Sequence, residues 1–248
     1  MRSLGIPEVL IILGLLVLLF GGARLPAFLA GLGRRFGLWL NQWRWVWRSM
    51  AGTEEEEILA EERVGKEQAA RLLEHMPPLA ADAELVRGLR SIGDRLAKAP
   101  LAARRHFHFY VVESPIANAF ALPGGYVFVT RRLAEMCEDS SETAFLLAHE
   151  MAHVASRHFV ENTVLQTLLG ALKTGQLLAE LVGKGYSREQ ELEADRKALE
   201  LLREAGFAEE GARRILRKLH GLSPEPPELL QYLSTHPRFE ERLEALRS

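Results

Sequence analysis

Residues 146–154 read Leu-Leu-Ala-His-Glu-Met-Ala-His-Val, an apolar segment that carries two histidines and one glutamate. On a helix, His149 and His153 lie one turn apart on the same face, so both imidazoles can reach a single ion. Glu150 belongs to the neighbouring face, where it can accept a proton from a water at that ion but cannot bind the ion itself. Two neutral imidazoles and one carboxylate suit zinc and leave one position for water. The alternative is a pair of structural histidines that bind no metal.

A second helix is expected to supply the carboxylate. Ser187 and Gln190 form a predicted capping box at its start. Its apolar stripe consists of Leu192, Ala198, Leu199 and Leu202. Glu191 and Asp195 lie along that stripe, where a carboxylate is costly unless it is paired or binds a cation. We therefore predict Glu191 as the third zinc ligand and Asp195 as the partner that fixes the tautomer of a ligand imidazole. The alternative is a capping glutamate and a buried ion pair with an arginine.

Hydrophobic periodicity and turn residues predict the elements around these two helices. The expected elements are helices at about 54–75, 83–98, 139–158, 161–182 and 187–205, strands at 106–112 and 126–130, and short helices at the C-terminal end. The helix at 161–182 is interpreted as a packed or lid helix, not a membrane span. The expected fold class is α+β. A mainly helical domain would hold the metal between the helices at 141–158 and 187–205, with a small β element on one side of the cleft.

The motif His149-Glu150-x-x-His153, followed by Glu191-x-x-x-Asp195, resembles the gluzincin family of HtpX, Oma-type and CAAX-prenyl-protein proteases. Residues 118–127 are similar to the strand-turn-strand that precedes the zinc helix in this family. Thr235-His236-Pro237, with Arg242 six residues after the histidine, is similar to its C-terminal element. The resemblance covers about residues 80–248.

This resemblance implies a zinc endopeptidase with one Zn²⁺ per chain and Glu150 as general base. The strand that contains Asn118, Ala119 and Phe120 would pair with an extended substrate, as peptides do at a sheet edge. The catalytic residues His236 and Arg242 would approach the zinc from the far side. In the family this histidine either stabilises the oxyanion or is a fourth ligand that keeps the enzyme latent. The alternatives are ordinary turn chemistry at Asn118 and a loop histidine before a proline.

The N-terminus contains an uncharged run of 15 residues, Val9–Ala23. A membrane span needs about 20 apolar residues, so this run would be a short one, and a cleavable signal peptide is the alternative. Apolar residues then recur at helical spacing: Leu25, Phe28, Leu29, Leu32, Phe36, Trp39, Leu40, Trp43 and Trp47. This pattern predicts an interfacial amphipathic helix, or else a core helix of a soluble domain. Five arginines after the run against one before it indicate that the following domain is cytoplasmic.

The same region resembles the start of the TatA/TatB translocation family over about 35 residues. The matching residues are Gly5-Ile6-Pro7-Glu8, Phe20-Gly21, Leu25-Pro26 and Leu32-Gly33-Arg34. The family has a short membrane helix, a hinge and an amphipathic helix on the cytoplasmic surface. Its Lys-rich tail is replaced here by a Trp/Arg segment, which favours reuse as an anchor over a role in translocation. By analogy alone, the segment allows self-association.

Composition excludes several other functions. The 31 basic and 33 acidic residues give a net charge of −2, so nucleic acid is not an expected partner. Cys137 is the only cysteine, which rules out an intramolecular disulfide and a cysteine metal site. His106 and His108 fit one face of a half-exposed strand. The remaining histidines occupy polar positions near helix ends and carry no functional signal: His75, His158 and His220.

Together these patterns predict a single-pass membrane-anchored zinc endopeptidase in protein quality control, which acts on protein or peptide substrates and contacts membrane lipid. The expected parts are a transmembrane anchor at 1–23, an interfacial helix at 24–52, a helical linker at 53–78 and the peptidase domain at 79–248. One alternative is a Tat-type transport component or scaffold with a non-catalytic peptidase fold, which predicts the loss of at least one ligand. Another is a periplasmic peptidase whose N-terminus is a signal or a reversed anchor.

Overall fold

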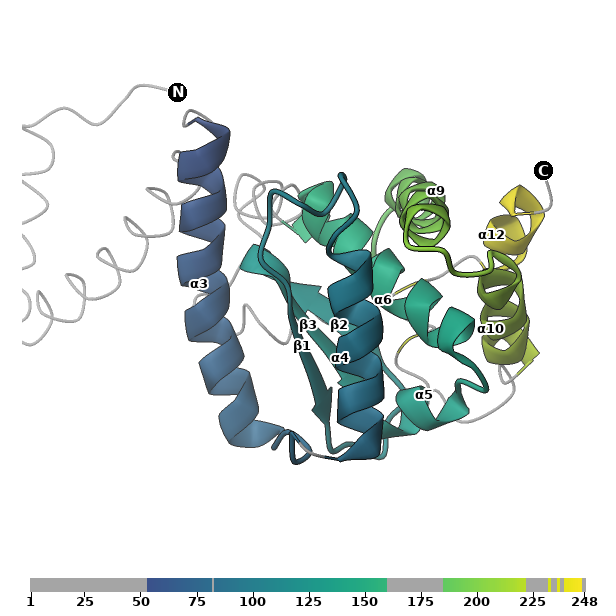
Figure 1. Cartoon of the computed structure of the whole chain (residues 1–248), viewed down its shortest axis with the longest axis horizontal. Coiled ribbons are helices and arrows are strands. Elements are labelled where there is room, and N and C mark those ends of the chain that lie inside the picture. The colour runs from purple at the N-terminus through teal and green to yellow at the C-terminus, as the bar shows by residue number, and fades with distance from the viewer. Residues whose placement is uncertain are drawn as a thin grey trace, which may run out of the picture. The chain divides into compact units, whose positions relative to one another are not determined.

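A computed structural model describes residues 53–81, 83–159, 185–221, 232, 236 and 239–246 (Figure 1). The chain separates into two compact units, Met1–Trp47 and Arg48–Ser248, and every described residue belongs to the second. The predicted membrane segment, the amphipathic helix and the helix at 161–182 lie outside the described residues. Within the described ranges, no helix combines the length and the apolar character that crossing a bilayer requires.

A three-stranded sheet with strand order β1-β3-β2 forms the β element. Strand β1 (His108–Val112) pairs in parallel with β3 (Tyr126–Thr130), and β2 (Ala119–Leu122) pairs with β3 in antiparallel register. The short 3-10 turn η1 (Pro123–Gly125) joins β2 to β3. At Gly125, φ is 87° and a Cβ atom would lie 2.0 Å from the His106 carbonyl oxygen, so only glycine fits this turn.

Helices cover both faces of this sheet. Alternate residues of β3 point to opposite sides, as the pleat of a strand requires. Val127 and Val129 belong to the larger core, with α4 (Glu84–Leu96) and α6 (Ser140–Ala155). Tyr126 and Phe128 belong to a smaller core that includes Ala69 of α3 (Glu54–His75). Figure 1 shows α3 on one side of the sheet and α4 with α6 on the other.

Helix α3 begins with a capping box at Thr53 and ends at His75. The Thr53 hydroxyl accepts a hydrogen bond from Glu56 N, while the Glu56 carboxylate accepts one from Thr53 N. Gly65 lets α3 approach η1 closely, because a Cβ at this position would lie 1.8 Å from the Pro123 carbonyl oxygen. The start of α3 at 54 and its end at 75 are as predicted.

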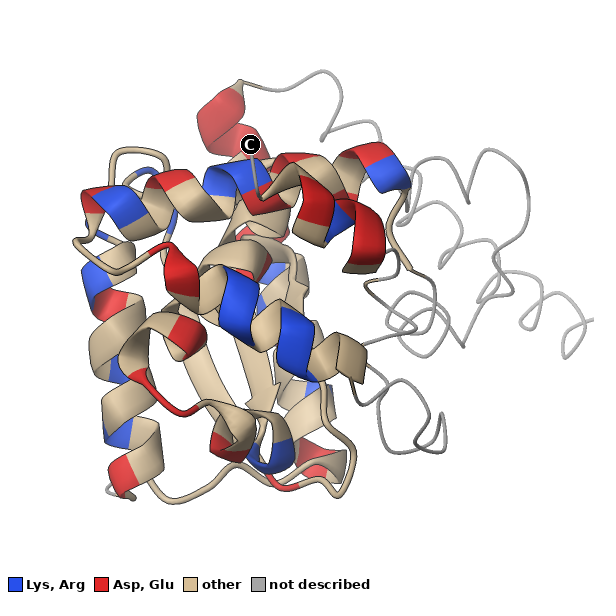
Figure 2. Cartoon of the chain, turned by 90° about the vertical axis from the view of Figure 1, so that its right-hand side faces the viewer, with Lys and Arg blue, Asp and Glu red and all other residues tan. Residues whose placement is uncertain are grey.

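Helices α9 (Arg188–Glu204) and α10 (Glu210–Gly221) pack against α6 on the side away from the sheet, and α12 (Phe239–Ala245) packs against both of them. Figure 2 shows the basic residues of α10 as a blue band in the centre of the view. Two of these basic residues, Arg214 and Lys218, form ion pairs with the fully buried Glu142 near the start of α6, at 3.2 and 3.0 Å. These ion pairs connect the start of α6 to α10.

The structure departs from the sequence-based expectation in a few places. Helix α6 ends at Ala155, whereas the prediction extended it to about His158. The reason is Arg157, whose φ of 59° cannot continue a right-handed helix. The short helix α5 (Arg131–Met136), capped by the Thr130 hydroxyl, was not predicted. The prediction of a mainly helical fold with a small sheet is confirmed for the described residues.

Candidate active site

Helix α6 is the centre of the site. Asp139 caps its start by accepting hydrogen bonds from Ser141 N and Glu142 N at 2.9 and 3.0 Å. Every residue from 144 to 154 is buried, because the sheet, α4, α9 and α10 surround this helix. His149 and His153 therefore project into a site closed to solvent, with exposures of 0% and 1%.

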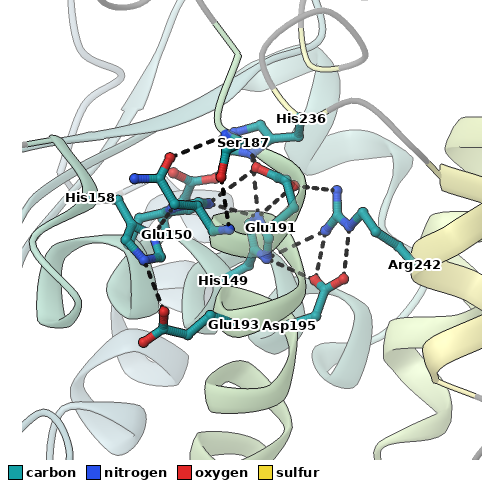
Figure 3. A network of polar contacts seen from close by, with 11 residues as sticks. His149, Glu150, His158, Ser187, Glu191, Glu193, Asp195, His236 and Arg242 are labelled. Carbon is teal, nitrogen blue, oxygen red and sulfur yellow. Dashed lines mark hydrogen bonds and ion pairs between the residues drawn. The ribbon is translucent and has the colours of Figure 1, made fainter. Parts of the chain in front are cut away.

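Four side chains converge on one small volume, with donor atoms all within 4.8 Å of one another: His149, His153, Glu191 and His236. The His149 and His153 Nε2 atoms lie 3.1 Å apart. Glu191 Oε1 lies 3.4 Å from His153 Nε2 and 3.0 Å from His236 Nδ1. His236 Nδ1 lies 3.2 Å from His149 Nε2. Figure 3 shows His149, Glu191 and His236 turned toward this common point.

These distances fit a metal ion. Tetrahedral zinc bonds of about 2.0–2.1 Å put neighbouring ligand atoms about 3.3–3.4 Å apart. Four of the separations between donor atoms in the cluster are 3.0, 3.1, 3.2 and 3.4 Å, and all of the donor atoms lie within 4.8 Å of one another. Imidazole nitrogens and one carboxylate are also the donor types that zinc prefers. Glu191 Oε2 is buried as well, and it lies 3.0 Å from the Nη1 atom of Arg242.

Asp195 and Arg242 support the cluster from behind. Asp195 Oδ1 lies 2.9 Å from His149 Nδ1, so the ring presents its other nitrogen to the cluster. Arg242 of α12 donates hydrogen bonds of 2.8 Å to both carboxylate oxygens of Asp195. Its Nη1 atom lies 3.0 Å from Glu191 Oε2. The guanidinium thus faces the two α9 carboxylates and lies beside the donor cluster.

Burial and neighbouring charges shift the pKa values of the cluster in different directions. Burial lowers the pKa of His153 well below its usual value, which favours the neutral form that binds a metal. Burial and Arg242 also oppose protonation of His149, but its contacts with Asp195 and Glu191 outweigh them and raise its pKa to about 9. Although burial opposes ionisation, His236 and Arg242 hold the pKa of Glu191 well below its usual value. A metal ion that bound this nitrogen near neutral pH would therefore have to displace a proton from His149.

Glu150 lies next to the cluster but is not one of its four members. Both of its carboxylate oxygens are buried, and neither accepts a hydrogen bond from a described residue. Oε1 lies 3.3 Å from His236 Nε2. Burial raises the pKa of Glu150 above its usual value. A carboxylate with open acceptor positions and a raised pKa beside a metal-type cluster has the properties of a general base.

The residues predicted to bind substrate lie in or next to β2, one of the two outer strands of the described sheet. Asn118 precedes β2, while Ala119 and Phe120 belong to it, and all three are at most 7% exposed. Next to them, the Ala117 carbonyl oxygen accepts a hydrogen bond of 3.2 Å from Tyr232 N. The far end of β2 approaches the cluster, because Ala121, Leu122 and Pro123 line a small pocket together with His153 and Tyr186.

Two residues that contact the cluster were not predicted from the sequence. His158, interpreted as a polar helix-end residue, is 1% exposed, and its Nδ1 lies 2.9 Å from His153 Nδ1. Tyr186 stacks on the His153 ring with centroids 3.7 Å apart and an angle of 16°. The position of His158 five residues after His153 was the available signal. No sequence pattern pointed to Tyr186.

Comparison with known proteins agrees with this geometry. Residues 85–248 match peptidase family M48. The chain is 31% identical to the beta-barrel assembly-enhancing protease of Yersinia pestis over 197 residues, which cover 69% of this chain and 40% of the relative. It is also 31% identical to the mitochondrial metalloendopeptidase OMA1 of Schizosaccharomyces pombe over 150 residues, 55% of this chain and 44% of that protein. The chain thus spans less than half the length of these curated relatives.

Proposed function

This chain belongs to peptidase family M48, and we propose that its buried cluster makes it a zinc-dependent endopeptidase that is anchored to a membrane and acts in protein quality control. The observation that carries the proposal is the convergence of His149, His153 and Glu191 beside Glu150. Peptidases of this family use a metal, and the donor types and spacings fit zinc. The names of the relatives, an assembly-enhancing protease and a metalloendopeptidase, support an activity on proteins.

Three residues of the chain, Glu150, Asp195 and Arg242, would act together with the metal in peptide hydrolysis. Zinc, when bound, supplies Lewis-acid polarisation of the scissile carbonyl and lowers the pKa of a water. Glu150 accepts the proton of that water and delivers it to the leaving amine. The oxygens of Glu150 are buried and accept no hydrogen bond from a described residue, and its pKa is raised. These properties suit both the uptake of the proton from water and its release to the amine. Asp195 holds His149 in the tautomer that leaves Nε2 free, and Arg242 compensates the charges of Asp195 and Glu191.

His236 supports a resting arrangement of this centre. A catalytic zinc site keeps one position for water, whereas four protein donors make a closed site. His236 Nδ1 lies within 3.2 Å of His149 Nε2 and 3.0 Å of Glu191 Oε1, as a fourth ligand would. We therefore propose that His236 moves aside before hydrolysis and then stabilises the oxyanion through its imidazole.

Substrate would bind as an extended strand beside β2, through Asn118, Ala119 and Phe120. The pocket between Pro123 and His153 supports this path, because it connects the end of β2 with the cluster. The anchor at 1–23 and the interfacial helix at 24–52 would keep the peptidase near lipid, on the cytoplasmic side by the arginine bias. Damaged or membrane-associated proteins are then the expected substrates, and the N-terminal segment allows self-association.

The decisive experiment compares the wild-type chain with Glu150→Gln, purified in detergent and loaded with zinc. We expect the variant to lose at least about 100-fold in casein cleavage, because it has no general base. Glu135→Gln, an exposed change on α5, is the matched control and should cleave normally. A chelator should abolish cleavage by the wild type. Undiminished cleavage by Glu150→Gln would refute the mechanism, and a folded wild type that cleaves nothing would favour the non-catalytic scaffold.

A further inference from the structure

We propose that His158 is a positioning residue for the ligand histidine His153. In this arrangement His158 accepts the Nδ1 proton of His153 and so leaves Nε2 of that ring free for the metal. The inference rests on the proposed function, because it takes His153 as a metal ligand. His158 itself is not one of the four side chains in the donor cluster.

A tight turn after α6 brings His158 back beside this helix. Arg157 adopts a left-handed backbone conformation with φ 59°, which is unfavourable for a residue with a side chain. Its guanidinium is held by Glu61 Oε1 at 2.8 Å and by Glu57, both on α3. These ion pairs stabilise the turn. The His158 ring consequently lies in the interior, with its centroid 5.0 Å from that of His153.

The distances decide which nitrogen carries each proton. His153 Nε2 faces His149 Nε2 at 3.1 Å and Glu191 Oε1 at 3.4 Å, so it is the nitrogen that a metal would use. A neutral imidazole then carries its proton on Nδ1. His153 Nδ1 lies 2.9 Å from His158 Nδ1, which must therefore be the acceptor. The proton of neutral His158 is consequently on Nε2, and this atom lies 3.5 Å from Glu193 Oε2.

Glu193 is itself held in place on α9. Its other oxygen, Oε1, lies 2.7 Å from Lys197 Nζ, and the same ammonium contacts Ser156 Oγ at 2.8 Å. Figure 3 shows Glu193 next to His158 and Asp195 next to His149. Each ligand histidine therefore has a partner at Nδ1. The two partners differ in kind, because His149 meets a carboxylate and His153 meets a second imidazole.

Substitution of His158 by asparagine or by glutamine distinguishes a hydrogen-bonding role from a packing role. The side-chain oxygen of asparagine takes about the position of histidine Nδ1 and can accept the same hydrogen bond, whereas the glutamine amide reaches instead to about the position of Nε2. We expect His158→Gln to weaken zinc binding about 10- to 100-fold, as loss of such a partner usually does, and His158→Asn to retain most of the wild-type affinity. Packing predicts the opposite order, because asparagine leaves the larger cavity.

The measurement is competition for zinc between the full chain in detergent and a chromophoric chelator. Thermal unfolding of the metal-free variants shows how far stability alone changes. Equal affinities for wild type and His158→Gln would overturn the inference, and so would a loss for His158→Asn as large as that for His158→Gln. A wild-type chain that binds no zinc would overturn the proposed function together with this inference.

A second measurement needs no variant. Imidazole ¹⁵N shifts of the zinc-loaded wild type report which nitrogen of each histidine carries the proton. We expect the proton on Nδ1 of His153 and on Nε2 of His158. A proton on His158 Nδ1 would contradict the inference even if zinc binding and proteolysis are normal, so the two proposals can fail separately.

Discussion

Arg242 holds Asp195 through two hydrogen bonds of 2.8 Å, one from Nε and one from Nη2, at a site where neither residue is more than 2% exposed. Its third nitrogen, Nη1, lies 3.0 Å from Glu191 Oε2. One guanidinium therefore faces two carboxylates that α9 presents on the same side. This contact explains how a helix can bury both acids one turn apart, since a charge without a partner is costly in the interior.

Replacement of Arg242 by methionine should destabilise the folded chain. Loss of one partner from a buried ion pair leaves an uncompensated charge, so we expect the free energy of unfolding to fall by about 3–5 kcal/mol. Arg217→Met, an exposed change on α10, should stay within about 0.5 kcal/mol of the wild type. Urea unfolding of the metal-free chain measures both. Similar midpoints for the two variants would mean that the Arg242 contacts contribute little.

Asp195 should make stability depend on pH in a defined window. Although burial opposes ionisation, Arg242 and His149 lower its pKa from 3.8 to about 2. Since the folded value lies below the unfolded one, the stabilisation is complete above about pH 4 and is lost as the pH falls toward 2. Asp195→Asn lacks this contribution at every pH. The gap between wild type and variant in urea unfolding should therefore narrow between pH 4 and 2.5, and a constant gap would contradict the shifted pKa.

Zinc should stabilise the chain only when the carboxylate of Glu191 is present. At a zinc concentration about 100 times the dissociation constant, binding adds about 2.7 kcal/mol, which raises Tm by about 5–10 °C for a chain of this size. Glu191→Ala should show little or none of this rise. Glu200→Gln, an exposed change on the same helix, should respond like the wild type. Differential scanning calorimetry with and without zinc measures Tm for the wild type and both variants. A rise in Tm of Glu191→Ala as large as that of the wild type would show that Glu191 is not a zinc ligand.

The two helices that carry the buried cluster could be predicted because their signals are local. The spacing of His149 and His153 fixes their common face, and Ser187 with Gln190 forms the expected capping box. The burial of Glu191 and Asp195 also follows from the apolar stripe that they share, since both are at most 2% exposed. These features depend only on helical periodicity and on the chemistry of helix ends.

The surroundings of the site could not be predicted in the same way, because they depend on contacts between distant segments. His158 lies in the interior because the chain turns back at Arg157. This turn is stabilised by an ion pair between Arg157 and Glu61, which lies 96 residues before Arg157 in the sequence. Tyr186 reaches His153 from the loop before α9. The spacing of His158 from His153 was a weak local signal for the first contact, and no spacing or propensity indicates the second. The long-range ion pairs and the ring stacking around the site could therefore be identified only from the structure.

Two glycine substitutions should change stability in opposite directions. Gly88 on α4 is exposed and has no atom within 4 Å of a new Cβ, so Gly88→Ala should stabilise the chain by about 0.5–1 kcal/mol through helix propensity. The same change at Gly65 puts a Cβ 1.8 Å from the Pro123 carbonyl oxygen, a backbone atom that cannot rotate away. We expect Gly65→Ala to cost about 1–3 kcal/mol, the usual range for overpacking.

Thermal unfolding of the two glycine variants provides the test, because each serves as a control for the other. Both add one methyl group inside a helix, so intrinsic propensity favours both equally. A lower Tm for Gly65→Ala then reports the close contact of α3 with Pro123 of η1 and with the Tyr126 side chain. If Gly65→Ala is as stable as Gly88→Ala, α3 does not pack against the turn between β2 and β3 as closely as the structure indicates.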